Sequence, residues 1–212
     1  MTGREGIFVF GASGHAKVIL DIIEQQGVYE VAIVVDDDPA REGTALCGYP
    51  VAGGKGALLA SGVKRGVIAI GSNRARAAVA QWLSAQGMDL VTVLHPSAQV
   101  ARSAVVGRGT VVMPCACINP DSQVGRNVII NTNATVEHDC TIGDHVHIAP
   151  GATLCGTVTV GEGSFVCAGA TVLPNVSIGS NVTIGAGSTV ICDIADQVTV
   201  VGSPARVIKP GR

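Results

Sequence analysis

The sequence predicts a two-part fold: a Rossmann-like α/β domain with a small parallel sheet over residues 1–94, followed by an all-β parallel β-helix over residues 95–212. Three observations support this prediction. The first half opens with an apolar strand, a glycine-rich turn and an amphipathic helix. In the second half a branched aliphatic residue recurs at every sixth position, and a glycine recurs at every eighteenth. A chain of 212 residues is long enough for two such domains.

The N-terminal region has the order of elements that opens a nucleotide-binding α/β unit. Residues 7–10 form the expected first strand, and residues 18–23 place aliphatic side chains on one face of the expected helix. The turn between them consists of Gly11, Ala12, Ser13, Gly14 and His15. Backbone N–H groups at such a helix start can approach a phosphate. The turn lacks the third glycine of the dinucleotide fingerprint, so a purely structural role stays open.

An acidic run ends the second expected strand, residues 31–35. It consists of Asp36, Asp37 and Asp38, and Pro39 follows. Ligands of open parallel sheets bind at the carboxyl ends of the strands, where these carboxylates lie. Guanine offers two neighbouring N–H donors that suit one carboxylate, which favours a guanine nucleotide over a uracil nucleotide. A solvated turn before the proline is the alternative.

The remainder of the first half completes the sheet. A third expected strand, residues 67–70, ends in a polar turn that contains Gly71 and Asn73, and residues 90–94 form a fourth strand. The buried side of the helix between them is expected to carry Ala78, Val79 and Trp82. Strands joined by helices in this way form βα units with a parallel sheet. We place the domain boundary after residue 94, before His95 and Pro96.

The aliphatic repeat defines the second half. Its members are Leu94, Val100, Val106, Val112, Ile118, Val124, Ile130, Val136, Ile142, Ile148, Leu154, Val160, Val166, Val172, Ile178, Ile184 and Val190. A period of six fits neither an α-helix nor an ordinary strand. It indicates a parallel β-helix in which each aliphatic side chain points into a stacked core. Strands of a β-sandwich, the alternative, recur about every 8 to 12 residues.

A column of glycines divides the repeat into coils. It consists of Gly107, Gly125, Gly143, Gly161 and Gly179. Three hexapeptides therefore make one coil, and the coils stack into a triangular prism. We expect glycine along this edge because the backbone turns tightly there or adopts a positive φ.

Composition excludes several classes of protein. A formal net charge of −2 gives no electrostatic footprint for nucleic acid. The chain has neither an apolar run long enough to cross a membrane nor an N-terminal signal pattern, so we expect a soluble cytoplasmic protein. The seven cysteines lack paired metal-ligand spacing and are expected to be reduced and mostly buried, and no metal site is expected.

One coil concentrates polar residues that can carry chemistry. They are Asn131, Asn133, Glu137, His138, Asp139, Asp144, His145 and His147. His138 stands two positions after the inward Val136, so it should project outward, where a neutral imidazole can accept a proton. Cys140 occupies an inward position and is a poor nucleophile, which disfavours a covalent acyl-enzyme. Surface histidines without a function are the alternative, and His95 and His145 are interpreted as structural.

The coils resemble the hexapeptide-repeat acyltransferases, and the first domain resembles the nucleotide-sugar-holding domain of certain bacterial members, the nucleotide-sugar N-acetyltransferases. The resemblance implies a left-handed β-helix and a homotrimer with acetyl-CoA bound between subunits. It implies His138 as general base and Asp139 as its orienter, although the family often has glutamate at this position and Glu137 is a substitute. The implied nucleotide-sugar contacts are Gly11, Ser13, Gly14, His15, Asp36, Asp37, Gly71, Asn73 and Asn131.

The same resemblance assigns the acetyl-CoA site. Its implied contacts are His147 on the acetyl carbonyl, the Gly156 N–H on the thioester carbonyl, and Gly169, Gly185, Gly187, Pro204 and Arg206. The motif at residues 201–205 is common near CoA in this family. Arg206 and Lys209 are candidates for the CoA phosphates, and a solvated basic tail is the alternative.

The leading hypothesis is an acetyl-CoA-dependent N-acetyltransferase that modifies the 4-amino group of a nucleotide-linked 4-amino-4,6-dideoxy sugar used in bacterial surface glycans. GDP-perosamine is favoured, from the aspartate run. Alternatives are a UDP-linked 4-amino sugar, sialic acid-type O-acetylation, a non-catalytic β-helix scaffold, and a zinc carbonic anhydrase that uses His138, His145 and His147.

Overall fold

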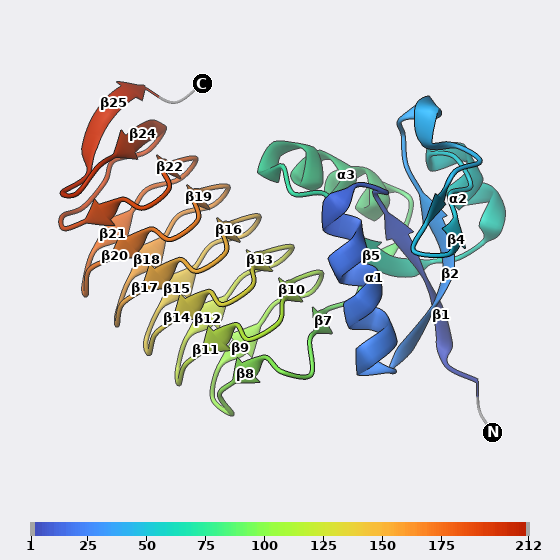
Figure 1. Cartoon of the computed structure of the whole chain (residues 1–212), viewed down its shortest axis with the longest axis horizontal. Coiled ribbons are helices and arrows are strands. Elements are labelled where there is room, and N and C mark those ends of the chain that lie inside the picture. Colours follow the sequence, from blue (N-terminus) through green and yellow to red (C-terminus); the bar gives the residue numbers. More distant parts are fainter. Residues whose placement is uncertain (1–2, 211–212) are drawn as a thin grey trace. The chain divides into compact units, whose positions relative to one another are not determined.

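The structure is a computed structural model that describes residues 3–210 (Figure 1). The chain forms two compact units, and the division falls between Pro96 and Ser97. The first unit is the α/β unit and the second is the coil unit. Within residues 3–210, no helix is both long and apolar enough to cross a membrane.

The α/β unit contains a four-stranded parallel sheet in the order β2-β1-β5-β6. These strands are β1 (Glu5–Phe10), β2 (Tyr29–Val35), β5 (Arg65–Ile68) and β6 (Asp89–Leu90). The chain pairs β2 with one edge of β1 and then crosses to pair β5 with the other edge. The carboxyl ends of β1 and β5 therefore form a topological switch point, which is where open α/β sheets bind ligands.

Three α-helices and several short elements complete this unit. They are α1 (Gly14–Gln26), α2 (Lys55–Ser61), α3 (Asn73–Ala85), the 3₁₀ helix η1 (Pro39–Arg41), β3 (Ala45–Leu46), β4 (Tyr49–Pro50) and β7 (Val93–Leu94). The expected single strand at 90–94 is thus wrong, because β6 pairs with β5 over two residues only and a separate strand, β7, follows. The core includes Phe8, Phe10, Val35, Leu58, Ile68 and Leu83.

The coil unit is a parallel β-solenoid with three sheets, so the predicted β-helix is confirmed. The β14 sheet contains β8 (Gln99–Val100), β11 (Cys117–Ile118), β14 (Thr135–Val136), β17 (Thr153–Leu154), β20 (Thr171–Val172) and β23 (Thr189–Val190). The β15 sheet contains β9 (Val105–Val106), β12 (Gln123–Val124), β15 (Thr141–Ile142), β18 (Thr159–Val160) and β21 (Ser177–Ile178). The β16 sheet contains β10 (Val111–Val112), β13 (Ile129–Ile130), β16 (His147–Ile148), β19 (Phe165–Val166), β22 (Thr183–Ile184), β24 (Val198–Val201) and β25 (Arg206–Pro210).

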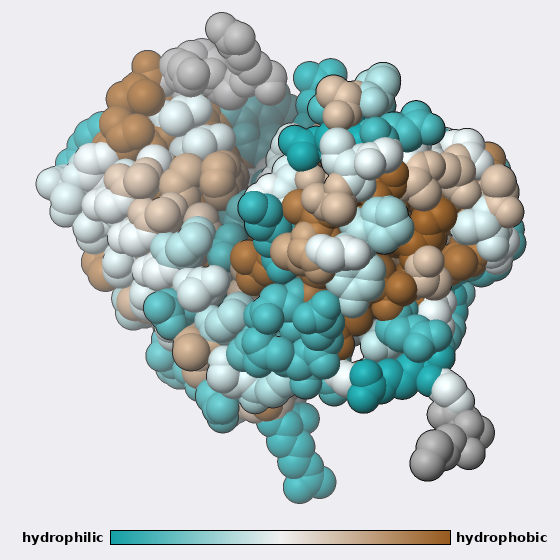
Figure 2. All heavy atoms as spheres, turned by 45° about the vertical axis from the view of Figure 1, so that its right-hand side comes forward, coloured by the Kyte–Doolittle hydropathy of each residue, from teal (hydrophilic) through white to brown (hydrophobic). Residues whose placement is uncertain are grey.

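The aliphatic repeat forms the core of the coils, as predicted. Every member from Val112 to Val190 is buried, whereas Val100 and Val106 in the first coil are half-buried. Strands β24 and β25 form an antiparallel hairpin after the last coil. This hairpin exposes Val207 (59%) and Ile208 (58%), and Figure 2 shows hydrophobic surface in this region at the upper left.

Positive φ does not explain why glycine occurs along the column, since none of its five members has a positive φ. Positive φ values fall instead on every sixth residue from Gly109 to Gly187, mostly Gly, Asn or Asp, which tolerate this conformation. In the column, a Cβ on Gly107 would lie 2.5 Å from the Gly125 carbonyl oxygen, and one on Gly143 would lie 2.7 Å from the Glu162 nitrogen. Positive φ was the wrong expectation here. Close approach of successive coils excludes a side chain along this edge.

Candidate active site

His138 lies at the corner that follows β14 and leads to the β15 sheet. Its side chain is 59% exposed, which confirms the predicted outward projection. The ring Nδ1 lies 2.7 Å from Asp139 Oδ2. Asp139 adopts φ 59°, one of the left-handed corner positions. The shorter aspartate side chain therefore reaches the imidazole.

The carboxylate of Asp139 determines which ring nitrogen of His138 can act as a base. A carboxylate accepts, so Nδ1 carries the donated proton and the Nε2 of the neutral ring is the acceptor. Glu137 has a different partner, because its Oε2 accepts a hydrogen bond from Asn119 Nδ2 at 2.9 Å. The pair His138–Asp139 thus presents an exposed proton acceptor of defined tautomer.

Gly156, one coil further along the chain, lies against the His138 ring. A Cβ at this position would lie 2.6 Å from Cε1 and 2.7 Å from Nε2 of His138. The Gly156 carbonyl accepts the Asn175 N–H at 3.1 Å, and within residues 3–210 no acceptor is in range of the Gly156 N–H. Because Gly156 has no side chain, the His138 ring can occupy this space. This is a packing role, separate from the N–H role that the family resemblance implies.

Cys140 is fully buried, as predicted, and its thiol donates to the Cys155 carbonyl at 3.2 Å. Burial raises the pKa of this thiol, which disfavours the thiolate that a nucleophile requires. All seven cysteines are free. The expectation that most are buried is wrong: Cys47, Cys115 and Cys192 are exposed, because they occupy turns and corners outside the stacked core.

His147 belongs to a second polar cluster. Its Nε2 accepts from Asn131 Nδ2 at 3.0 Å, and Asn131 Oδ1 accepts the Thr132 N–H at 2.8 Å, which fixes the amide orientation. The imidazole stacks on Phe165 with a centroid distance of 4.8 Å. His147 lies in the β16 sheet, whereas the His138 corner joins the other two sheets. Within a single chain, His147 therefore lies next to Asn131, a residue expected in the nucleotide-sugar site.

The glycines expected to contact CoA have two different environments. Gly169 and Gly187 occupy equivalent corners with φ 66°, and a Cβ on either would meet nothing within 4 Å. At Gly185, packing within the chain explains the glycine, because an added Cβ would lie 2.6 Å from Val201 Cγ1. Pro204 and Arg206 are exposed at the β24–β25 connection. The side chain of Lys209 lies outside the described residues.

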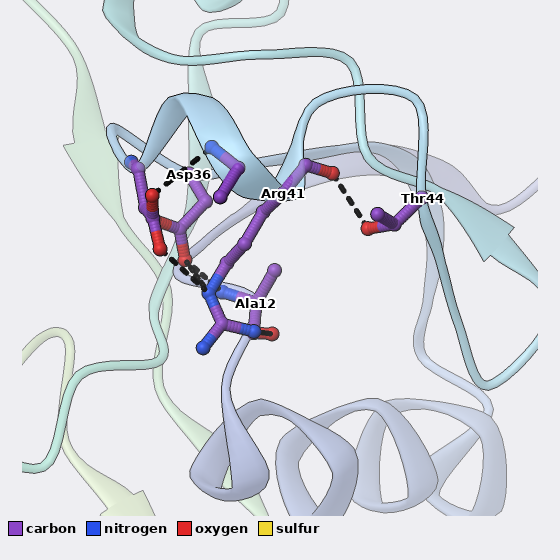
Figure 3. A network of polar contacts seen from close by, with 6 residues as sticks. Ala12, Asp36, Arg41 and Thr44 are labelled. Atoms are coloured by element: carbon purple, nitrogen blue, oxygen red, sulfur yellow. Dashed lines mark hydrogen bonds and ion pairs between the residues drawn. The ribbon is translucent and has the colours of Figure 1, made fainter.

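The glycine turn of the α/β unit is held by an aspartate at the end of β2 (Figure 3). The Ala12 N–H donates to Asp36 Oδ2 at 2.6 Å, and Arg41 Nη1 donates to the Ala12 carbonyl at 2.7 Å. Asp36 Oδ1 accepts the Asp38 N–H at 2.9 Å. Both carboxylate oxygens of Asp36 are thus engaged within the chain, and the side chain is only 17% exposed.

Asp37 is more accessible than Asp36, since it is 46% exposed. Its Oδ2 forms an ion pair with Lys55 Nζ at 3.0 Å, and its Oδ1 accepts the Lys55 N–H at 3.2 Å. The Lys55 ammonium in turn lies 5.3 Å from the centroid of the Trp82 ring. Of the two aspartates expected to contact a base, Asp37 is better placed to do so.

Arg76, a buried cation on α3, organises the loop that follows β5. Its guanidinium donates to the carbonyls of Ile70 and Gly71, both at 3.2 Å, and to Asn73 Oδ1 at 2.9 Å. Burial lowers the pKa of Arg76 to about 10. Burial, together with the Arg76 charge, lowers the pKa of His15 to about 4.

The remaining turn residues lie at helix starts. Ser13 is the N-cap residue of α1 and Gly14 is its first residue, while Asn73 begins α3. Arg41, Lys55 and Arg76 were not expected at this edge of the sheet. Arg76 had a signal, since it precedes Val79 by three residues and so shares its face; Ala78, expected to be buried, is exposed.

Within residues 3–210, no group of three or more His, Cys, Asp or Glu side chains could hold a metal ion. The three histidines of the carbonic anhydrase alternative lie apart in the coil: His138 and His145 occupy different corners, and His147 lies in a strand. His145 Nδ1 lies 2.9 Å from Asn127 Nδ2, which fits the structural role expected of it.

Comparison with known proteins identifies both units. Residues 6–83 match the family model of the PglD N-terminal domain. Residues 121–156 and 157–192 match the model of the bacterial transferase hexapeptide (six repeats).

Three relatives extend these matches. A mutant of perosamine N-acetyltransferase from Caulobacter crescentus, solved in complex with CoA and GDP-perosamine, is 39% identical; the match covers 99% of this chain and 98% of that one, with a TM-score of 0.91. The acetyltransferase domain of PglB from Neisseria gonorrhoeae, in complex with acetyl coenzyme A, is 38% identical over 97% of this chain and 100% of that one, with a TM-score of 0.88. UDP-N-acetylbacillosamine N-acetyltransferase of Bacillus subtilis is 42% identical over 110 residues, which span 50% of this chain and 50% of that protein.

Proposed function

The chain belongs to the hexapeptide-repeat nucleotide-sugar N-acetyltransferases, and we propose that it transfers an acetyl group from acetyl-CoA to the 4-amino group of a nucleotide-linked 4-amino-4,6-dideoxy sugar. The observation that carries this proposal is the His138–Asp139 pair set against Gly156. It places an exposed proton acceptor beside a residue whose backbone N–H makes no hydrogen bond within residues 3–210.

In the proposed reaction His138 is the general base. The sugar amine forms a bond to the thioester carbonyl carbon, the C–S bond breaks, and Nε2 takes the proton that the nitrogen loses and can return it to the CoA thiolate. Asp139 keeps Nδ1 protonated and stabilises the resulting imidazolium. A base of this kind contributes about 10²- to 10⁴-fold to the rate.

The coil also supplies groups that fit the acetyl donor. The Gly156 N–H is available to polarise the thioester carbonyl, as an oxyanion-type donor. Gly169 and Gly187 leave open surface where an extended pantetheine arm could lie close to the backbone. Arg206, exposed at the end of the solenoid, is available for a CoA phosphate.

For the acceptor we favour GDP-perosamine. The relative solved with GDP-perosamine matches nearly the whole chain, and Asp37 offers an exposed carboxylate at the end of β2 that can pair with the two N–H donors of guanine. A UDP-linked 4-amino sugar is the second candidate, favoured by the match to UDP-N-acetylbacillosamine N-acetyltransferase. The sialic acid-type O-acetyltransferase reaction requires a hydroxyl acceptor in the same place.

We further propose a homotrimer with sites between subunits. Support comes from the separation of the two histidines, because His147 lies in the sheet that does not adjoin the His138 corner. A site that uses both side chains is therefore completed by a second copy, whose β16 sheet would face the His138 corner.

The test is thiol release from acetyl-CoA with GDP-perosamine and with a UDP-4-amino-4,6-dideoxy sugar, for the wild type, His138→Ala and His145→Asn. We expect turnover of one nucleotide sugar, about 10²- to 10⁴-fold lower kcat in His138→Ala, and no change in His145→Asn, a histidine at the next corner.

Other results discriminate the alternatives. Full activity of His138→Ala would refute the general-base role and leave the transferase function standing. Absence of thiol release with every amino sugar, combined with release in the presence of sialic acid, would replace N-acetylation by O-acetylation. Absence of release with all acceptors would favour the scaffold.

A further inference from the structure

Arg76 is the largest of the fully buried side chains, with 1% of its surface exposed, and it lies at the carboxyl end of β5. Burying a charged group is costly unless the surroundings or a ligand compensate it. Its guanidinium donates hydrogen bonds to the carbonyls of Ile70 and Gly71 and to the side-chain oxygen of Asn73. These bonds tie the loop between β5 and α3 to a positive charge beneath it.

The same loop contacts the glycine turn directly. A Cβ on Gly11 would lie 2.7 Å from the Ala69 carbonyl oxygen and 3.1 Å from Ile70 Cγ1, and Gly11 adopts φ +115°. Ile70 is the residue whose carbonyl Arg76 binds. The guanidinium and the turn thus contact the same short segment, Ala69–Ile70, at the topological switch point between β1 and β5.

The Arg76 charge acts on His15, a residue of the turn. Its pKa is lowered to about 4, first by burial and then by the positive charge of Arg76. A charge that disfavours a second cation in the turn favours an anion there by the same interaction. The Gly11 and Ala12 N–H groups are bonded to Val35 O and Asp36 Oδ2, so the backbone N–H groups suited to phosphate are those at the start of α1.

We propose that Arg76 is a positioning residue for the diphosphate of the nucleotide sugar. Its charge favours the anion at the carboxyl ends of β1 and β5, beside residues 11–15, and its hydrogen bonds hold the neighbouring loop, residues 70–73. The inference rests on the proposed function, which requires a nucleotide diphosphate in the α/β unit.

The charge of the ligand separates this role from a purely structural one. GDP carries more negative charge than GMP, so a favourable electrostatic field from Arg76 strengthens GDP binding more than GMP binding. Loss of the Arg76 charge lowers the preference for GDP over GMP. Loss of loop structure alone weakens both nucleotides equally. The same comparison applies to UDP and UMP.

The experiment is calorimetric titration of full-length protein with GDP, GMP, UDP and UMP. The variants are Arg76→Gln, which retains hydrogen-bond donors, Arg76→Lys, which retains the charge, and Arg74→Met, which removes an exposed charge from the same helix. We expect Arg76→Gln to bind the diphosphate about tenfold more weakly and to lose most of the preference over the monophosphate. Arg76→Lys should keep most of the preference, and Arg74→Met should match the wild type.

Two results would overturn the inference while leaving the proposed function intact. They are unchanged diphosphate affinity in Arg76→Gln, and equal weakening of diphosphate and monophosphate. Trp82, the single tryptophan, lies in the α/β unit and reports by fluorescence whether each variant is folded. If Arg76→Gln does not fold, Arg76→Lys provides the test. This folded variant retains the charge, so loss of its preference for the diphosphate over the monophosphate would contradict the role of the charge. Failure of the wild type to bind either diphosphate would overturn the proposed function and this inference with it.

Discussion

The His138 corner of the coil unit and the Gly11–Arg76 region of the α/β unit are built in opposite ways. At the corner, an exposed histidine and an exposed aspartate form one 2.7 Å contact beside a glycine. In the Gly11–Arg76 region, the charged groups are buried or bonded to backbone, and a Cβ on Gly11 would overlap the carbonyl of Ala69 in the neighbouring loop.

Function and stability are coupled in the Gly11–Arg76 region and separate at the His138 corner. A solenoid coil holds its corners by backbone hydrogen bonds to the coils on either side, so outward side chains there are not needed for folding. In the Gly11–Arg76 region the residues expected to contact the ligand also hold the loops together. Substitutions at the corner should therefore change the rate at constant stability, and substitutions in the Gly11–Arg76 region should change both.

The largest effect is expected for Gly11→Ala. This residue has φ +115°, and the added Cβ would lie 2.7 Å from the Ala69 carbonyl oxygen. Strain and overlap should destabilise the α/β unit by about 3 kcal/mol, measured by urea denaturation followed by Trp82 fluorescence. Gly14→Ala is the matched control, because its Cβ would meet nothing within 4 Å. Equal denaturation midpoints for the two variants would contradict the tight packing of the turn.

Gly156→Ala tests the corner in the same manner. The new Cβ would displace the His138 ring, whose exposure lets it move without disturbing the core. We expect kcat to fall about 100-fold, with an unchanged thermal unfolding temperature.

A double-mutant cycle is the control for this substitution. If Gly156→Ala acts by displacing His138, the double variant with His138→Ala should be no slower than His138→Ala alone. Independent, additive losses would instead indicate that Gly156 acts mainly through its N–H.

The stability of the α/β unit should depend on pH through His15. The folded pKa of about 4 lies below the ordinary value of 6.5, so between these pH values the unfolded chain binds more protons. The free energy of unfolding should therefore fall as the pH drops from 6.5 to 4, by about 2 kcal/mol. The measurement is urea denaturation by Trp82 fluorescence at several pH values. His15→Gln should lack this part of the pH dependence, and an identical slope in both proteins would exclude it.

The smallest effect is expected for Asp139→Asn. Asparagine keeps the left-handed corner conformation but no longer stabilises the imidazolium with a charge. Because both partners are more than half exposed, water screens the pair, and we expect kcat to fall only about tenfold. Asp121→Asn is the control, since Asp121 is exposed and holds the same conformation at the equivalent corner one coil earlier. A similar loss in both variants would show that Asp139 has no special role.

The repeat made much of the coil unit predictable. The inward aliphatic residues, the outward His138 and the inward Cys140 all follow from a period of six, because each coil repeats the geometry of the previous one. The reach of Asp139 to His138 could not be read from that period. It depends on the left-handed corner conformation, which falls on a different position from the glycine column.

The α/β unit shows the opposite balance. Its order of strands and helices could be derived from local patterns, and these patterns also placed a glycine turn and an acidic strand end at the carboxyl edge of a sheet. No local pattern showed that Asp36 is bonded to the Ala12 N–H, or that Arg76 supports the loop against which Gly11 packs, because both contacts form only when the chain folds. The same is true of the Asn131–His147 pair in the coils. These partners are joined by no repeating interval, so their contacts depend on how distant segments pack, whereas a regular repeat encodes its own packing.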